Sequence, residues 1–489
     1  MSLIRKLASD TAAYGISSIL ARLINFFFGF LIIKYISPAE YGVYGKFYAY
    51  AGFFLVLLTH GMETAYFRHY NKEEYRQKAF ATAFVSVFIV TFIYLMISYL
   101  LADNISAWVE EPKGFVLLFT WMMVFDVLAA LPFASLRATG RPVCFAALKI
   151  VNILLFIGFN IFFFILLPKI SGSSSWDLNF GLPNVVYVFS ANLLASAFTL
   201  LFLLPQLKHL KNGADAALYR RMLWYALPIM VVGFAGMINE MLDRALMTKL
   251  LTGTKEENDI QLGIYSFNYK FSMLMTLFLQ AYRYAAEPFF FAQAKHEDSK
   301  KVYADTMKYF IISGCVIFLL ITLNVPLLQA VLMKYSPTAQ HYFVGARVIP
   351  ILLMANLCLG IYFNISTWYK ITDKTHIGAL VSIVGALITL ILNYLWIPVI
   401  GYMGSAWATF ICYFVMVIIG YILEMKYYPI RYDLPRIFTY LAIALLLFFV
   451  TDFIYGKYSI HVMLQTVISL VCICSFIAFA YFKERHKKI

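Results

Sequence analysis

Long apolar runs recur along the entire chain and limit what it can fold into. A helix that crosses a bilayer needs about 20 consecutive apolar residues. We count fourteen runs of this kind, separated by short polar breaks. The runs cover residues 11–36, 43–66, 79–101, 114–136, 143–168, 183–205, 224–250, 262–288, 303–325, 345–369, 376–398, 403–424, 435–455 and 460–482. The sequence therefore predicts an all-α polytopic membrane protein with about 14 transmembrane helices.

Composition and charge agree with this prediction and give the chain an orientation. Hydrophobic residues make up 62% of the chain and charged residues 13%, whereas soluble domains contain about 25% charged residues. Of the 39 lysines and arginines, 24 lie in alternate polar segments that include both termini, and the segments on the other side hold five. Short cytoplasmic loops are rich in these residues. We therefore expect cytoplasmic termini, and we assign the net charge of +14 to orientation and anionic lipid rather than to nucleic acid.

Two distant parts of the chain share a pattern. Lys46 and Lys270 each follow a Gly-(Val/Ile)-Tyr motif, precede a phenylalanine, and are followed 17 residues later by a glutamate. The turn RATGRP and Asn160 recur, 233 residues later, as KITDKT and Asn393. The repeat spans six helices, so both copies have the same orientation in the membrane. We predict two six-helix lobes related by a pseudo-two-fold axis along the membrane normal.

The repeat divides the chain into three parts. We predict an N-terminal lobe at residues 1–210 (spans 1–6), a C-terminal lobe at 211–426 (spans 7–12) and two additional helices at 427–489. Transporters built from such repeats bind substrate at the repeat interface. All loops are short, which favours a transporter over an enzyme, and the chain has no Gly-x4-Gly-Lys-(Ser/Thr) motif for ATP.

The first run contains an arginine, in the stretch YGISSILARLINFFFGF. Counting about 1.5 Å per residue from residue 11 places Arg22 roughly 16 Å deep, where an ionised group costs about 2.5 kcal/mol or more. Ser18 and Asn25, at i−4 and i+3, share its face. Arg22 could form a structural ion pair or bind a phosphate in a central cavity. We favour the second interpretation because the planar guanidinium donates two hydrogen bonds to one phosphate.

Charged residues of the repeated helices are further candidates. Lys46 and Lys270 lie toward the outer ends, and Glu63 and Glu287 about 25 Å away at the inner ends. We assign both lysines and Arg283 to the substrate cavity, and both glutamates to gating. Alternatively, the lysines extend to the membrane interface and the glutamates form ordinary ion pairs. Arg283 lies one turn before Glu287 and could pair with it.

The seventh run concentrates four polar residues, Asn239, Glu240, Asp243 and Arg244. Glu240 and Arg244 have the i, i+4 order that favours a helical ion pair. Asn239 and Asp243 could instead hold a coupling cation or proton, and we include all four residues among the coupling or gating candidates. Asp126 in the fourth run is another coupling candidate. We expect no catalytic residue, no cofactor and no defined metal site, with the membrane potential, H+ or Na+ as alternative driving forces.

The first run followed by SPAEYGVYG, the INEMLDRALM of the seventh run and the two six-helix halves resemble a known family. It is the polysaccharide-exporter (Wzx-like) branch of the multidrug/oligosaccharidyl-lipid/polysaccharide (MOP) flippase superfamily, related to the MurJ lipid II flippases and the MATE antiporters. The resemblance implies a flippase of the bacterial cytoplasmic (inner) membrane that moves a polyprenyl-pyrophosphate-linked oligosaccharide outward by alternating access, for O-antigen, capsule or exopolysaccharide biosynthesis. The implied partners are membrane lipids, the lipid-linked glycan and polysaccharide polymerase or assembly proteins.

Three alternatives remain at this point. A lipid II flippase would carry a related anionic headgroup. A cation-coupled multidrug antiporter of the same fold would favour an acidic cavity, whereas the deep charge of the first run is basic. A membrane glycosyltransferase or polymerase is disfavoured because the chain lacks a long external loop.

Overall fold

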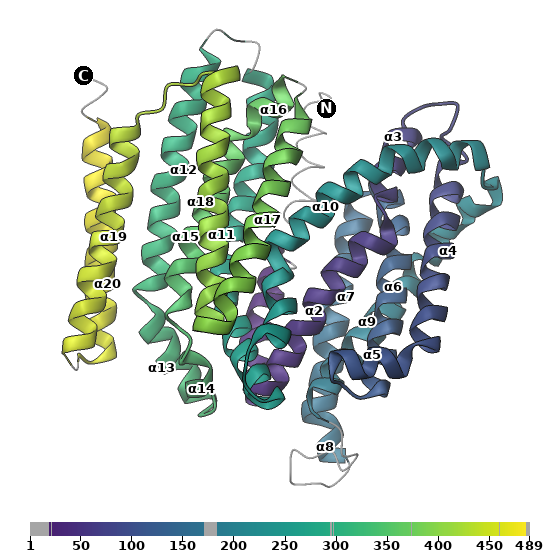
Figure 1. The fold of residues 1–489 in the computed structure, drawn as a ribbon, viewed down its shortest axis with the longest axis horizontal. Coiled ribbons are helices and arrows are strands. Elements are labelled where there is room, and N and C mark those ends of the chain that lie inside the picture. Colours follow the sequence, from purple (N-terminus) through teal and green to yellow (C-terminus); the bar gives the residue numbers. More distant parts are fainter. Residues whose placement is uncertain are drawn as a thin grey trace. The chain divides into compact units, whose positions relative to one another are not determined.

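The fold is helical throughout the part of the chain that the structure describes. This computed structural model describes residues 19–20, 22–170, 183–293, 296, 298–372, 374–458 and 460–485. These residues form helices and connecting turns, with no β-strand among them (Figure 1). Twelve of the helices are long and apolar enough to cross a membrane. The prediction of an all-α polytopic membrane protein is therefore confirmed.

The twelve candidate spans overlap twelve of the fourteen predicted runs. Of the other two, the run at 11–36 begins in residues outside the described part, and its residues 22–31 are helical. The run at 262–288 lies in α11 (Lys255–Gln293), a helix of 39 residues that is not among the twelve. The total of fourteen spans stays a prediction.

The chain divides into two compact units. The N-terminal unit comprises Met1–Phe28 and Val43–Met241, and the C-terminal unit comprises Gly29–Gly42 and Leu242–Ile489. The segment Gly29–Gly42 thus belongs to the unit formed by the second half of the chain, although it begins within the first helix. The predicted three-part division at residues 1–210, 211–426 and 427–489 stays a prediction.

The N-terminal unit packs its helices around an aromatic core. Helix α9 packs against both α6 and α7, and α6 packs against α4. Phe47, Phe115, Phe119 and Phe189 meet edge to face in the middle of the core. The elements of this unit are α2 (Pro38–Thr59), α3 (Met62–Tyr70), α4 (Ala79–Leu100), α5 (Ala102–Val109), α6 (Lys113–Ala138), α7 (Pro142–Ile161), η2 (Phe162–Leu166), α8 (Leu167–Ile170), α9 (Val185–Leu203), η3 (Leu204–Asn212) and most of α10 (Ala216–Leu250).

The C-terminal unit repeats this packing order. Helix α18 packs against both α15 and α17, and α15 packs against α12. The last two helices, α19 and α20, pack on α12 as an addition to the repeat. The elements are η1 (Ile32–Lys34), α11, α12 (Ser299–Thr322), α13 (Val325–Tyr335), α14 (Ala339–Phe343), α15 (Val348–Ile365), α16 (Thr367–Ile371), α17 (Thr375–Ile400), α18 (Tyr402–Tyr427), α19 (Leu434–Lys457) and α20 (Val462–Arg485).

The two asparagines of the repeated pattern have matching environments. Asn160 on α7 and Asn393 on α17 are 2% and 0% exposed. Each side-chain amide donates a 2.7 Å hydrogen bond to the carbonyl oxygen four residues earlier, of Phe156 and Thr389 respectively. A buried amide needs such a partner. The shared environment and packing order agree with the predicted internal duplication.

The segment Gly29–Gly42 packs closely on α11. A Cβ atom at Gly42 would lie 1.9 Å from the carbonyl oxygen of Asp259, and one at Gly263 would lie 1.8 Å from that of Pro38. Only glycine allows the two backbones to approach so closely. The hydroxyl of Tyr342 also donates a 2.8 Å hydrogen bond to the carbonyl oxygen of Ile36. These contacts explain why the start of α2 belongs to the C-terminal unit.

Candidate substrate-binding site

The first helix separates a polar face from an apolar one. Arg22 and Asn25 are exposed, and Leu20, Phe27 and Leu31 are exposed as well. At about 100° per residue, Arg22 lies roughly 160° around the helix from Leu20. The exposed apolar residues suit contact with lipid, so the arginine is on the side away from them. Ser18, predicted to share the polar face, lies outside the described residues.

The guanidinium of Arg22 is available to a ligand. Among the described residues, none forms a hydrogen bond or an ion pair with this side chain. The alternative of a structural ion pair therefore finds no partner in the described part of the chain. A buried charge is tolerated in a membrane helix when it faces a water-filled cavity. Arg22 and Asn25 form the candidate site in the N-terminal unit.

Lys270 on α11 lies against the continuation of the first helix. A Cβ atom at Gly29 would be 1.9 Å from the Lys270 ammonium nitrogen, which also lies 5.3 Å from the ring centroid of Tyr41. Gly29 comes seven residues after Arg22, so the two share one helical face. Our sequence reasoning missed Gly29, although its i+7 spacing from Arg22 could have indicated it. The structure thus gives Lys270 a close contact with Gly29 inside the C-terminal unit.

Lys46, the residue that matches Lys270 in the repeat, has a different environment. Its ammonium is 2.7 Å from a carboxylate oxygen of Glu111, and the two side chains are 2% and 8% exposed. The same nitrogen donates to the carbonyl oxygen of Val109 at 3.2 Å. A buried ammonium with these partners is a structural ion pair. We therefore leave Lys46 out of the candidate site, and its predicted contact with substrate stays a prediction.

The predicted pairing of Arg283 with Glu287 is wrong. The carboxylate of Glu287 instead pairs with Lys370, on the turn that the repeat pattern matches to residues 137–142. The guanidinium of Arg283 lies 4.2 Å from the ring centroid of Phe363. Lys370 lies on α16 and Phe363 on α15, and i, i+4 spacing does not reveal partners on other helices. The substrate role of Arg283 and the gating role of Glu287 stay predictions.

The predicted ion pair between Glu240 and Arg244 is also wrong. Glu240 is exposed, and no described residue forms an ion pair with it. Arg244 lies 3.9 Å from the ring centroid of Tyr269 on α11. Asp243 is 3% exposed and accepts a 2.5 Å hydrogen bond from the hydroxyl of Tyr265. Helix α11 therefore supplies Tyr269 as a partner for Arg244 and Tyr265 as a partner for Asp243.

The remaining α10 candidate and the fourth-run candidate are both inside the protein. Asn239 is buried, with a partner elsewhere in the fold. Asp126 on α6 accepts a 2.5 Å hydrogen bond from Ser196 on α9. The ion-coupling roles of Asn239, Asp243 and Asp126 stay predictions.

A second polar group lies in the N-terminal unit. Asp126 lies in the electrostatic field of Lys149 on α7, whose ammonium is 4.2 Å from the ring centroid of Phe133. Glu63 on α3 lies in the fields of Lys149 and Arg137. Two carboxylates and two cations thus lie near enough to influence one another electrostatically. The sequence indicated these residues singly, and their proximity depends on how α3, α6 and α7 pack.

The described residues offer no evident metal site. No group of three or more histidine, cysteine, aspartate or glutamate side chains among them is placed to hold a metal ion. The six cysteines are free. The exposed guanidinium of Arg22 is a group whose chemistry suits an anion.

Comparison with known proteins gives the site a context. The family model described as "Polysaccharide biosynthesis protein" matches residues 7–293, which include Arg22, the α10 cluster and Lys270. No curated protein sequence matches the chain.

Solved structures show the same fold. A structure of the lipid II flippase MurJ in an inward closed conformation matches with a TM-score of 0.72 and 15% identity, over 96% of this chain and 99% of that chain. An inward-facing MATE multidrug transporter of the MOP superfamily matches with a TM-score of 0.65 and 14% identity, over 83% and 94%. An outward-facing MATE transporter matches with a TM-score of 0.59 and 13% identity, over 86% and 95%. The resemblance to the MOP superfamily is thus confirmed.

Proposed function

The chain belongs to the polysaccharide biosynthesis protein family, and from this premise we propose that it moves a polyprenyl-pyrophosphate-linked oligosaccharide from the cytoplasmic to the outer leaflet of the bacterial inner membrane. The observation that carries the proposal is the exposed guanidinium of Arg22, on the helix face opposite the exposed apolar residues. The family and the fold are those of membrane transporters. What we propose beyond the family and the fold is that the cargo is a lipid-linked oligosaccharide.

The chemistry of the cargo explains why a cation is needed. The polyprenyl tail is apolar and remains in the bilayer during transfer, whereas the pyrophosphate and the sugars cannot enter hydrocarbon without a partner. A guanidinium donates paired hydrogen bonds to phosphate oxygens. Asn25, less than one turn from Arg22, offers an amide that can donate to and accept from sugar hydroxyls. Arg22 thus suits the pyrophosphate of the headgroup, and Asn25 suits its sugars.

The membrane potential can drive this transfer. One elementary charge that crosses a potential of 100 mV gains about 2.3 kcal/mol. An anionic headgroup moves outward when the cell interior is negative, and the empty cationic site is drawn back. The proposed cycle therefore needs neither ATP nor a bound metal ion for its direction.

Transfer of the headgroup in reconstituted vesicles tests the proposal. Vesicles that contain the purified protein and a fluorescent polyprenyl-pyrophosphate oligosaccharide are probed with a quencher that cannot cross the membrane. We expect protein-dependent movement of this lipid, and no faster movement of a neutral polyprenol of equal length. A protein that moves neither lipid but confers resistance to cationic drugs would contradict the proposal and favour an antiporter. A change in the covalent structure of the glycan would indicate an enzyme.

A further inference from the structure

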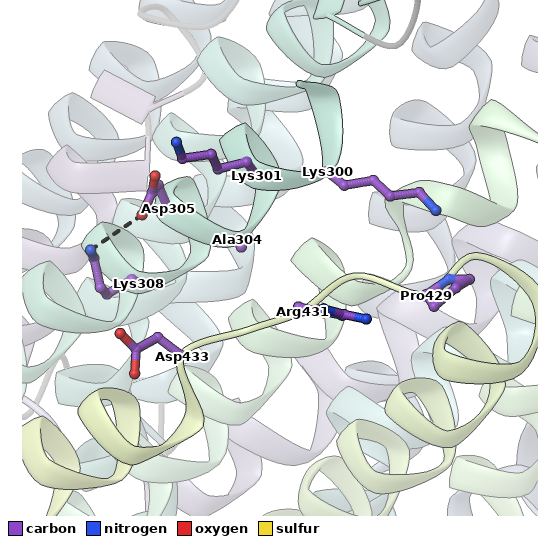
Figure 2. Close-up of a pocket in the computed structure, with 8 residues that line it drawn as sticks. All are labelled: Lys300, Lys301, Ala304, Asp305, Lys308, Pro429, Arg431 and Asp433. Atoms are coloured by element: carbon purple, nitrogen blue, oxygen red, sulfur yellow. Dashed lines mark hydrogen bonds and ion pairs between the residues drawn. The ribbon is translucent and has the colours of Figure 1, made fainter. Parts of the chain in front are cut away.

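The C-terminal unit contains a cavity that is separate from the Arg22 site. Its volume is ≈ 510 Å³, within the range of about 300–1,000 Å³ that small-molecule pockets occupy. One wall is the beginning of α12, and the other is the segment between α18 and α19 (Figure 2). Figure 2 shows Lys300 and Lys301 on the first wall and Arg431 on the second.

Part of the charge around this cavity is already balanced. The ammonium of Lys308, only 3% exposed, lies 2.6 Å from Glu484 and 3.2 Å from Asp305. Arg436 pairs with Asp433 at 3.2 Å and with Glu484 at 3.5 Å. These pairs tie α12 to α19 and α20. Asp305 and Asp433, the two carboxylates that line the cavity, are thus both paired already.

Lys300, Lys301 and Arg431 are the cations in excess. All three are exposed and line the cavity, and no described residue forms an ion pair with any of them. Lys300 lies 4.8 Å from the ring centroid of Tyr428, which holds it beside the opposite wall. Both lysines are in the first turn of α12, a 24-residue helix, where the backbone adds a partial positive charge. Lysine and arginine side chains donate charge-assisted hydrogen bonds to phosphate oxygens, so a cavity that all three line suits a phosphate group.

The surroundings favour a lipid as the source of this phosphate. Tyr309 on α12 and Phe438 on α19 are 52% and 64% exposed, and both helices are apolar enough to cross a membrane. An acyl chain could therefore lie along the helices that begin at the cavity. The segments around residues 289–302 and 425–436 are those predicted to be cytoplasmic. We infer that this cavity binds the phosphate of an anionic phospholipid from the cytoplasmic leaflet.

Photocrosslinking tests the inference. The full-length protein is reconstituted with a photoactivatable phosphatidylglycerol, and labelled peptides are identified by mass spectrometry. Lysine and arginine side chains attract anionic lipid, so the Lys300→Gln, Lys301→Gln, Arg431→Gln variant should lose labelling of residues 428–436 by about tenfold or more. The matched control, Lys169→Gln, Lys334→Gln, Lys457→Gln, removes three exposed cations elsewhere and should label like the wild type.

Further arms separate charge, folding and the source of the phosphate. A variant that keeps the charges, Lys300→Arg, Lys301→Arg, Arg431→Lys, should retain labelling. Should the neutral triple variant fail to fold, Arg431→Gln alone should still lower labelling severalfold. Unchanged labelling in the neutral variants would overturn the inference. Displacement of the label by millimolar glycerol phosphate, but not by unlabelled phosphatidylglycerol, would overturn a lipid as the source.

This inference does not depend on the proposed function. Arg22→Ala should leave the phosphatidylglycerol labelling unchanged. The failure of one account would therefore leave the other standing.

Discussion

The ammonium nitrogen of Lys270 occupies the space beside Gly29, where a Cβ atom would lie only 1.9 Å from it. A methyl group at residue 29 would therefore displace the end of a flexible side chain rather than a rigid backbone. The helix itself gains from the substitution, because alanine is about 1 kcal/mol more favourable than glycine in a helix interior. A substitution at residue 29 can thus move the Lys270 ammonium without lowering the stability of the helix.

We predict that Gly29→Ala leaves the melting temperature unchanged or slightly higher and lowers headgroup transfer. The control is Gly158→Ala on α7, where an added Cβ atom would meet nothing within 4 Å. Melting followed by tryptophan fluorescence and transfer in vesicles measure the two effects. Wild-type transfer by Gly29→Ala would show that the position of Lys270 does not matter.

The buried pair of Lys46 and Glu111 should be structural. Lys46→Met leaves an uncompensated buried carboxylate, which destabilises a protein by about 3–5 kcal/mol. The double variant Lys46→Met, Glu111→Gln removes both charges, so most of the lost stability should return. A double-mutant cycle of thermal unfolding measures the coupling. If the double variant is stable but transfers no headgroup, Lys46 has the substrate role that the sequence predicted.

Asp215 should make stability depend on pH. It lies before α10 and accepts 3.0 Å hydrogen bonds from the amides of Leu218 and Ala217, while Lys78 is 3.2 Å away. The hydrogen bond from the Leu218 amide, followed by the one from Lys78, lowers the pKa of this carboxyl below its usual 3.8. A lowered pKa in the folded state contributes stability above the unfolded pKa, and this stability is lost as the pH falls through the folded value.

The comparison of Asp215→Asn with the wild type measures this contribution. Asparagine can still cap the helix but cannot ionise. We expect the wild type to melt at a higher temperature from pH 5 to pH 7, and the difference to shrink below about pH 4. A difference that stays constant down to pH 3 would contradict the assignment.

The sequence predicts the positions of the helices better than it predicts the partners of their charged residues. Apolar runs located twelve spans because length and hydropathy are local properties. The run at 262–288, which lies in α11, is not among these twelve. The i, i+4 rule predicted partners for Glu240 and Arg283, and both predictions were wrong. Arg244 and Arg283 instead contact aromatic rings on neighbouring helices.

The candidate site shows the same division. The sequence identified Arg22 and Asn25 because a cation and an amide stand out in an apolar run. It could not identify Glu111 as the partner of Lys46, since the two residues are 65 positions apart and meet only after α5 has packed. It also missed the cavity at Lys300 and Arg431, because nothing in the chain shows that these segments face each other.

The membrane potential should change the rate of transfer. An inside-negative potential of 100 mV contributes about 2.3 kcal/mol for each elementary charge moved, which sets an upper limit of roughly fifty-fold on the acceleration per charge. Potassium gradients with valinomycin impose the potential on vesicles of known protein orientation. A rate that ignores the potential but follows a proton or sodium gradient would indicate an electroneutral, ion-coupled cycle.

The most direct measurement compares Arg22→Ala with Arg22→Lys in the vesicle transfer assay. A hydrogen bond to a charged group contributes about 1.5–3 kcal/mol, so Arg22→Ala should lower headgroup transfer by roughly 10- to 100-fold. Arg22→Lys should retain part of the activity. Arg220→Ala, which removes an exposed arginine from α10, should transfer like the wild type. If Arg22→Ala, correctly folded, moves the headgroup at the wild-type rate, then Arg22 does not bind the cargo and the central claim is contradicted.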